Sequence, residues 1–201
     1  MEDRLYKDVM EQLLKKDLNT YEHSVRVGKL CAAMAAPLQL DEKQAEWLLL
    51  GGCLHDVGKM LVPKYILTKK SALSPHEWKI MQQHTYLGAQ TLHDYEVEPE
   101  IVDIIHFHHE RLNGKGYPLG LSGRDIPALA QICGIVDSFD SMVSDRPYRK
   151  GMPFQDAEEE LLLHSGTQFD SEYVQMFLTL SPTYGGVYDG QTVLCQEAKH
   201  D

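Results

Sequence analysis

The sequence predicts an all-α fold in one domain. Apolar residues recur at helical spacing along most of the chain, and capping residues, prolines and glycines separate these segments. The 201 residues, 43% of them hydrophobic, supply enough material for a core, and no internal repeat or linker divides them. We therefore expect one helical domain over residues 1–181 and a tail over residues 182–201 that is irregular or forms a short hairpin.

Two helices are predicted in the N-terminal part. Residues 3–16 carry apolar side chains at helical spacing with charges between them. The following residues break this pattern and offer Asn19 or Thr20 as an N-cap. A second helix is expected over residues 21–36, with His23 in its first turn. Considered alone, a histidine at such a position is more often an ordinary core or surface residue than a ligand.

A third helix, capped by Asp41, is apolar on most sides and is expected to be the central buried one. It ends at His55-Asp56, and Gly58 follows as a stop signal. Adjacent helical residues point about 100° apart, so the pair can reach one pocket from neighbouring directions. A buried aspartate is costly without a partner, and its two oxygens can bridge two cations. The pair therefore predicts a two-metal site, with a salt-bridged or capping aspartate as the alternative.

The next predicted helix begins with a capping box formed by Ser74 and Glu77. His84 lies on its inward face. The other residues expected to face inward are Trp78, Met81, Leu87 and Leu92.

A fifth helix begins near Pro99 and ends in a histidine-rich segment that includes His106, His108 and His109. Three histidines in four positions at the end of an apolar helix indicate metal or nucleotide binding. A purely structural histidine cluster is the alternative.

A glycine-rich loop over residues 111–125 follows, and loops of this length in a compact domain are more often functional than not. A sixth helix runs from about Pro127 to Met142 and is interrupted by Asp137 and Asp140. Asp137 lies on an otherwise apolar face and needs a cation or hydrogen-bond donors.

The segment over residues 144–150 is basic and suits phosphate contacts, although an ordinary solvated turn explains its composition equally well. Two further amphipathic helices are expected over residues 153–164 and 171–180.

Composition limits the kinds of partner. The net charge of −11 argues against a surface that coats nucleic acid, but bound cations would still allow a small anionic ligand. The four cysteines form no CxxC pair, which favours buried free thiols in a reducing compartment. No run approaches the roughly 18 apolar residues of a membrane span, and we expect a cytoplasmic protein.

Together these motifs resemble the HD-GYP family, the cyclic di-GMP phosphodiesterases of the HD-domain metal phosphohydrolases. The resemblance covers about residues 20–180 and implies an HD-domain helical bundle of about seven to eight helices. The residues that carry it are, in order, His23, His55-Asp56-Val57-Gly58-Lys59, His84, His108-His109-Glu110, Gly116-Tyr117-Pro118, Ile126-Pro127, Asp137-Ser138-Phe139-Asp140-Ser141-Met142, Arg146-Pro147-Tyr148-Arg149 and Gly166-Thr167-Gln168-Phe169-Asp170.

The resemblance implies two divalent metal ions, iron or manganese before zinc or nickel. The implied ligands are His23, His55, Asp56 and Asp137 for one metal, with Asp56 bridging to a second held by His84, His108 and His109. Lys59 would contact a substrate phosphate and, with Asp56, serve catalysis. The remaining substrate-binding residues would be Lys115, Gly116, Tyr117, Pro118, Arg146, Arg149 and Lys150.

The implied reaction is hydrolysis of cyclic di-GMP to pGpG, or onward to GMP, by a water activated by two metals. Some family members hold a third metal through a glutamate at the position of Asn19, so two metals are expected here. Asn113 replaces a frequent aspartate, with a small expected effect on the loop. A diguanylate cyclase or sensory protein acting in trans and a homodimer are candidate partners. The alternatives are another cyclic dinucleotide or nucleotide as substrate, and a silent module that binds cyclic di-GMP or docks a partner.

Overall fold

The computed structural model describes residues 3–93, 95–145 and 150–188, and across these the regular secondary structure is entirely helical. The all-α prediction is therefore confirmed. None of the helices in these ranges has the length and apolar character needed to cross a membrane. The elements are α1 (Asp3–Lys16), α2 (Leu18–Ala33), α3 (Glu42–Leu54), η1 (Val57–Leu61), α4 (Lys64–Leu67), α5 (Pro75–Gln82), α6 (His84–His93), α7 (Pro99–Phe107), η2 (Gly123–Asp125), α8 (Ala128–Val143), α9 (Phe154–Leu163), α10 (Ser171–Leu178), η3 (Ser181–Thr183) and α11 (Tyr184–Tyr188).

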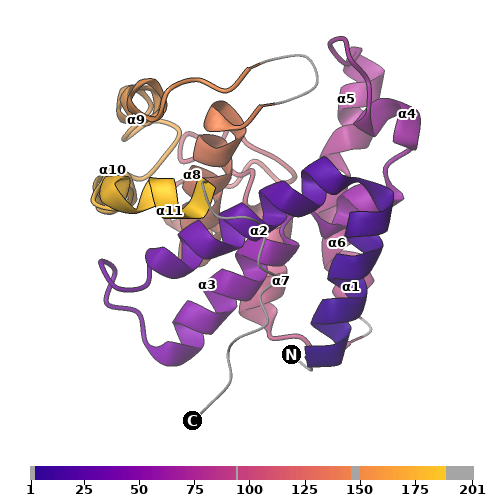
Figure 1. Ribbon diagram of the computed structural model, residues 1–201, viewed down its shortest axis with the longest axis horizontal. Helices are drawn as coiled ribbons and strands as arrows, with labels where there is room; N and C mark the ends of the chain where they lie inside the picture. The colour runs from indigo at the N-terminus through magenta and orange to yellow at the C-terminus, as the bar shows by residue number, and fades with distance from the viewer. Residues whose placement is uncertain (1–2, 94, 146–149, 189–201) are drawn as a thin grey trace.

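Four helices, α2, α3, α7 and α8, form the centre of the bundle. α2 packs against α3 and α8, while α7 packs against α3, α6 and α8. The shorter helices α9–α11 lie on one side of this centre, and α1, α5 and α6 lie on the other (Figure 1). The bundle thus places the ends of several helices close together in its middle.

The apolar interior consists of two clusters that share helices. One cluster joins α2 and α8 to α9–α11, and the other joins α1, α2, α3 and α7. Val27 contributes to the first and Val25 to the second, although both belong to α2. In the same way, α3 and α7 contribute to both clusters. Because these helices are held by apolar contacts on two sides, their ends are fixed in position.

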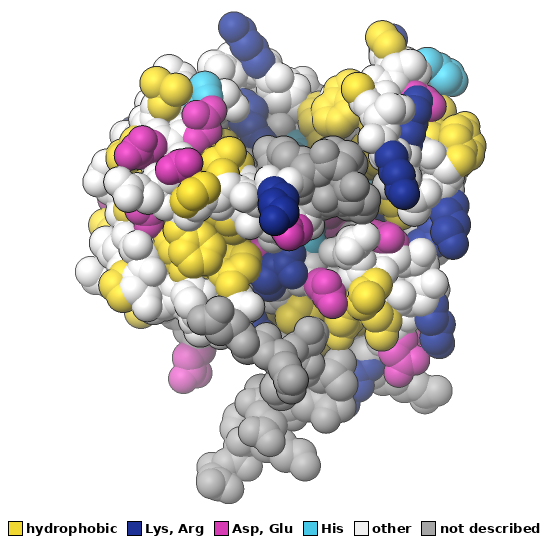
Figure 2. Space-filling view, turned by 45° about the horizontal axis from the view of Figure 1, so that its top comes forward, with side chains coloured by type: hydrophobic (Ala, Val, Ile, Leu, Met, Phe, Trp, Pro, Cys, Tyr) yellow, Lys and Arg dark blue, Asp and Glu magenta, His cyan; other side chains and the backbone are white. Residues whose placement is uncertain are grey.

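Acidic and basic side chains are interspersed on the face that Figure 2 shows, and its described residues form no continuous basic surface. This distribution agrees with the acidic composition and does not resemble the basic footprint of a nucleic-acid-binding protein.

The second helix begins earlier than the sequence suggests. Asp17, and not Asn19 or Thr20, is the N-cap of α2, because its carboxylate accepts a hydrogen bond from the amide nitrogen of Thr20 at 2.9 Å. Asn19 is consequently an exposed residue of the first turn.

The helix predicted to continue inward from Ser74 is two helices, α5 and α6, separated at Gln83. The capping box at Ser74 is present. At the break, the imidazole of His84 and the hydroxyl of Thr85 bond to the carbonyl oxygens of Met81 and Gln82, which satisfies these groups outside a continuous helix. The expectation for Trp78 is wrong, because this side chain is 47% exposed.

The chain after residue 182 differs from the irregular or hairpin tail that we expect from the sequence. Residues 184–188 form α11, and Tyr184 is fully buried. Its ring packs against Phe139 and Phe177, with ring centroids 4.6 and 5.6 Å away. This aromatic cluster fixes the helix, since such contacts add to the gain from apolar burial. Residues 189–201 of the expected tail lie outside the described residues.

Gly58, expected as a helix stop, serves a different purpose in η1. A Cβ atom at this position would overlap the carbonyl oxygen of His84 and lie 2.6 Å from the amide nitrogen of Gly88. The absence of a side chain therefore lets η1 and α6 pack backbone to backbone, which brings His84 next to the end of α3.

We predict that Gly58→Ala destabilises the protein by about 1–3 kcal/mol or more, because the added methyl group forces packed backbone apart. Chemical unfolding of the metal-free protein measures this difference. Gly186→Ala is the matched control, since a Cβ atom there meets nothing within 4 Å. Equal free energies of unfolding for the two variants would contradict the prediction.

Candidate metal centre

All seven side chains for which metal ligation is predicted converge in the middle of the bundle. They come from α2, the end of α3, the start of α6, the end of α7 and α8. Three overlapping groups among them place their ligand atoms within 4.8 Å of one another: His23, His55 and Asp137; His55, Asp56 and His108; and His84, His108 and His109.

The first group combines two imidazoles and a carboxylate. The Nε2 atoms of His23 and His55 are 3.2 Å apart. Asp137 Oδ1 lies 3.1 Å from Nε2 of His23 and 3.8 Å from Nε2 of His55. These three atoms surround one point, so a single cation could contact all of them.

The third group, His84, His108 and His109, consists of imidazoles only and is called the imidazole group below. The Nε2 atoms of His84 and His108 are 3.5 Å apart, and His109 completes the group. Imidazole sets of this kind suit zinc, iron or nickel better than calcium or magnesium.

Asp56, which belongs to the remaining group, lies between the first group and the imidazole group and presents one oxygen to each. Its Oδ2 atom is 3.4 Å from Nε2 of His55 and 3.6 Å from Nε2 of His23, while Oδ1 is 3.4 Å from Nε2 of His84. Oδ1 is buried and has no hydrogen-bond partner among the described residues. A buried carboxylate oxygen without a partner is costly, and a second cation held by the imidazole group would remove that cost. The residues present therefore fit a pair of metal ions.

The histidines are oriented from behind by backbone carbonyl groups. Nδ1 of His55 bonds to Gly52 O at 2.7 Å, Nδ1 of His84 to Met81 O at 2.7 Å, and Nδ1 of His108 to Ile105 O at 3.0 Å. A carbonyl oxygen only accepts, so Nδ1 carries the proton and the Nε2 lone pair faces the centre. This is the tautomer that a metal ligand requires.

Burial and charge keep most of the centre in the ligating protonation state. Burial lowers the pKa of His84 to about 4 and the pKa values of His108 and His109 well below 6.5. Burial alone would raise the pKa of Asp56, but the nearby positive charge of Lys59 and His55 holds it well below its usual range. His84, His108 and His109 are thus neutral imidazoles, and Asp56 is an ionised carboxylate.

His55 and His23 are exceptions. Burial lowers the pKa of His55, but the charge of Asp56 and a hydrogen bond to it outweigh burial and raise that pKa. The same holds for His23. Burial lowers its pKa, but hydrogen bonds to Asp137 and Asp140 outweigh burial and raise the pKa to about 9. A cation bound at this position would replace the proton on His23.

The sequence patterns assign no role to Asp140 and do not indicate Arg26 or Tyr188. Asp140 is fully buried and its Oδ2 atom lies 2.7 Å from Nδ1 of His23. Arg26 and Tyr188 hydrogen-bond to the same carboxylate. The spacing of three residues between Asp137 and Asp140 places both on one face of α8 and is the signal that could have indicated a shared role.

The loop that carries the expected substrate-binding residues Gly116, Tyr117 and Pro118 is fixed against the metal centre. Gly116 packs on the backbone of residues 109–111, where a Cβ atom would lie 2.5 Å from the carbonyl oxygen of His109. The ring of Tyr117 lies beside that of His109, with centroids 4.6 Å apart. Glu110 holds the far end of the loop, since its Oε1 atom accepts hydrogen bonds from the amide nitrogens of Leu119 and Gly120. Pro118 follows Tyr117 in the same wall.

The predicted phosphate-binding residues fall into two sets. Lys59 lies at the centre, where its ammonium group pairs with Asp56 Oδ2. Lys115 and Lys150 are exposed and show no contact with the seven converging side chains in the described part of the chain. Arg146 and Arg149 lie outside the described residues.

Comparison with known proteins agrees with this geometry. The HD domain family model matches residues 8–173. A cyclic di-GMP phosphodiesterase of Thermotoga maritima is 38% identical over 176 residues, which are 86% of this chain and 48% of that protein. A 3′3′-cGAMP-specific phosphodiesterase of Vibrio cholerae is 35% identical over 164 residues, 79% of this chain and 31% of that protein. The chain thus spans half or less of the length of these relatives.

The fold also matches a solved structure. An HDGYP protein from Bdellovibrio bacteriovorus superposes with a TM-score of 0.67 at 26% identity, over 82% of this chain and 52% of that one. The family match over most of the chain shows that this protein belongs to the HD domain family, and its relatives confirm the resemblance to HD-GYP phosphodiesterases.

Proposed function

We propose that this chain is a metal-dependent phosphodiesterase that hydrolyses cyclic di-GMP to pGpG, or onward to GMP. The observation that carries the proposal is Asp56, whose two oxygens face two separate groups of imidazoles. The relatives from Thermotoga maritima and Vibrio cholerae are named as phosphodiesterases of cyclic dinucleotides, which supplies the substrate class.

We assign one metal to His23, His55, Asp56 and Asp137, and a second to His84, His108, His109 and the other oxygen of Asp56. This donor set of imidazoles and carboxylates does not choose among iron, manganese, zinc and nickel. We favour iron or manganese because the resemblance to the HD-GYP family implies them. When bound, such a pair supplies Lewis acidity that polarises a phosphodiester and lowers the pKa of water. The exposed amide of Asn19 offers a weak ligand at most, which supports two metals and not three.

The chain's own residues position the substrate in this proposal. Lys59 pairs with Asp56 in the structure, so its ammonium group lies where it can exchange this partner for a substrate phosphate oxygen. Tyr117 and Pro118 form a wall beside the imidazole group, held by Glu110. We assign supporting phosphate contacts at the mouth to Lys115, Arg146, Arg149 and Lys150. No side chain is assigned as general acid for the leaving oxygen.

A related cyclic dinucleotide is the second candidate substrate, because the relative from Vibrio cholerae is named for 3′3′-cGAMP. A silent binding module is disfavoured, since a module without turnover has no need of a complete set of seven ligands. We place the activity in the cytoplasm, with cyclic di-GMP as ligand and a diguanylate cyclase, a sensory protein or a second copy of this chain as candidate partners.

The central test is turnover after anaerobic loading with Fe²⁺ or Mn²⁺. We expect hydrolysis of cyclic di-GMP with pGpG as the first product, identified by chromatography and mass spectrometry. Parallel reactions with 3′3′-cGAMP and cyclic di-AMP rank the substrates by kcat/KM. A fully loaded protein that binds cyclic di-GMP without cleaving it would refute the proposed reaction and favour the binding module.

A second prediction concerns the bridging carboxylate. Asp56→Asn should lower metal content below two ions per chain and reduce turnover by more than ~100-fold. Loss of a hydrogen-bond partner behind a metal ligand already costs up to about 100-fold, and loss of a bridging ligand should cost more. Elemental analysis and the same turnover assay measure both quantities. Glu159→Gln is the matched control, because it also removes one negative charge but lies exposed on α9. Two metals per chain in Asp56→Asn would contradict the assignment.

A further inference from the structure

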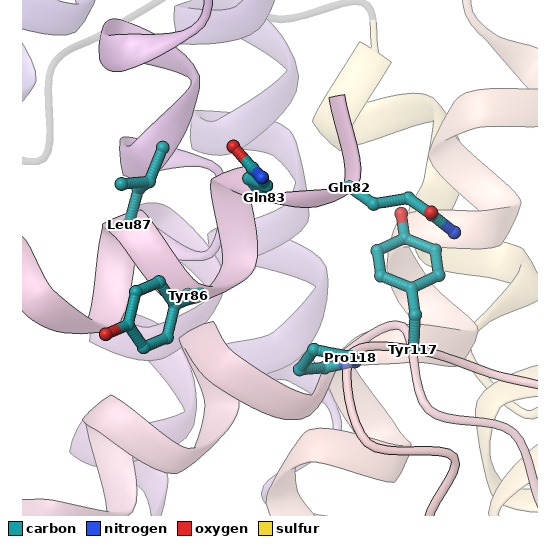
Figure 3. A pocket seen from close by; sticks show the side chains of 6 residues that line it. All are labelled: Gln82, Gln83, Tyr86, Leu87, Tyr117 and Pro118. Atoms are coloured by element: carbon teal, nitrogen blue, oxygen red, sulfur yellow. The ribbon is translucent and has the colours of Figure 1, made fainter. Parts of the chain in front are cut away.

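A cavity of about 350 Å³ lies beside the metal centre, between the α5–α6 junction and the loop that carries Tyr117 (Figure 3). Its size falls at the lower end of the range for small-molecule sites. Its lining residues are Gln82, Gln83, Tyr86, Leu87, Tyr117 and Pro118.

The cavity adjoins the imidazole group of the metal centre. Gln83 directly precedes His84 in the chain. The ring of Tyr117 lines the cavity and also lies 4.6 Å from the ring of His109 and 6.4 Å from that of His84, centroid to centroid. One ligand could therefore place a phosphate at the centre and a neighbouring group in the cavity.

The lining is neutral, aromatic and amide-bearing. Neither the Gln82 nor the Gln83 side-chain amide has a hydrogen-bond partner within the part of the chain that the structure describes, so each can offer a donor and an acceptor to a ligand. Both rings are held in place: Gln90 Nε2 contacts the Tyr86 hydroxyl at 2.6 Å, and Trp78 lies edge-on to Tyr117.

This chemistry matches a purine and not a second phosphate. A purine has apolar faces that stack on aromatic rings and an edge of donors and acceptors that side-chain amides recognise. A phosphate would need cationic side chains, and the lining contains none.

We propose that this cavity binds one purine base of the cyclic dinucleotide whose phosphate lies at the metal centre. This inference rests on the proposed function, and it makes Gln82 and Tyr86 residues that determine substrate specificity.

The test compares a substrate that has a purine with one that lacks it. For Gln82→Ala and Tyr86→Ala we expect the KM for cyclic di-GMP to rise about tenfold, as for loss of one base contact. Metal content and kcat/KM for methyl p-nitrophenyl phosphate, a diester without a purine, should stay unchanged. Gln155→Ala, an exposed glutamine on α9, is the control and should match the wild type in every assay.

An unchanged KM for cyclic di-GMP, or an equal loss on both diesters, would overturn the cavity assignment. If the loaded wild-type protein cleaves neither diester, the proposed function fails, and calorimetric binding of cyclic di-GMP then tests the cavity alone. In that case, wild-type affinity in both variants would overturn it.

A separate observation concerns the side of the centre away from this cavity. The buried carboxylate of Asp140 bonds to Nδ1 of His23 at 2.7 Å and accepts two hydrogen bonds from Arg26, at 2.8 and 3.0 Å. The hydroxyl of Tyr188, on α11, donates to its Oδ1 atom at 2.8 Å. The Arg26 guanidinium also lies over the Tyr188 ring, 5.7 Å from its centroid.

We infer that Asp140 and Tyr188 are positioning residues for His23, which the proposed function makes a metal ligand. Asp140 fixes the imidazole so that Nε2 faces Asp137 and His55. Tyr188 and Arg26 in turn fix the carboxylate, so that α11, more than 160 residues after His23 in sequence, supports the metal centre.

Tyr188→Phe tests this inference, because it removes the hydroxyl and keeps the ring. We expect metal affinity to fall about tenfold, and up to about 100-fold in Asp140→Asn, as for other partners of ligating histidines. Competition with a chelator measures affinity, and the visible spectrum of the Co²⁺-loaded protein reports ligand geometry. Tyr173→Phe, on α10 outside the centre, is the control.

The positioning role requires that Tyr188→Phe changes the metal affinity and the Co²⁺ spectrum. The unfolding temperature of the metal-free protein should stay within about 2 °C of the wild type. Wild-type affinity, or an affinity loss matched by an equal loss of metal-free stability, would overturn the positioning role.

Discussion

The structure depends on the placement of one buried carboxylate. Asp56 follows an apolar helix, and its two oxygens are taken out of water between two groups of imidazoles. A buried ionised group is tolerated only where charges or donors surround it. The charges and donors around Asp56 must therefore come together at one point. The packing of the bundle places there the ends of α3 and α7, the start of α6 and the inner faces of α2 and α8.

Groups that never touch the central point control its geometry. Backbone carbonyls behind His55, His84 and His108 fix the tautomers, and Asp140 does the same for His23. Because Gly58 has no Cβ atom, η1 and α6 approach closely enough to place His84 beside the end of α3, which carries His55 and Asp56. Precision in such a site comes from partners behind the ligands as much as from the ligands themselves.

The two sides of the centre have different physical characters. On one side lie Tyr117 and the neutral cavity beyond it, which suit a flat, partly apolar ligand group. On the other side, Arg26 and, from α11, Tyr188 form a network of charge-assisted hydrogen bonds with the buried carboxylate of Asp140. In the function that we propose, the first side recognises the substrate and the second holds His23 in place.

The sequence alone determined the helical class, most helix boundaries and the candidate ligands at His55-Asp56, at Asp137 and in the histidine-rich segment, because periodicity, caps and histidine-rich helix ends are local signals. His23 and His84 became candidate ligands only through the resemblance to the HD-GYP family. The sequence did not determine that Trp78 is exposed, that α11 forms around Tyr184, or that Asp140 supports His23. These features depend on contacts between residues far apart in the chain, and a local pattern carries no information about which distant side chain will fill a given space. Only the tertiary structure decided that Asp56 presents one oxygen to each group of imidazoles, because this requires five helical segments to be placed together.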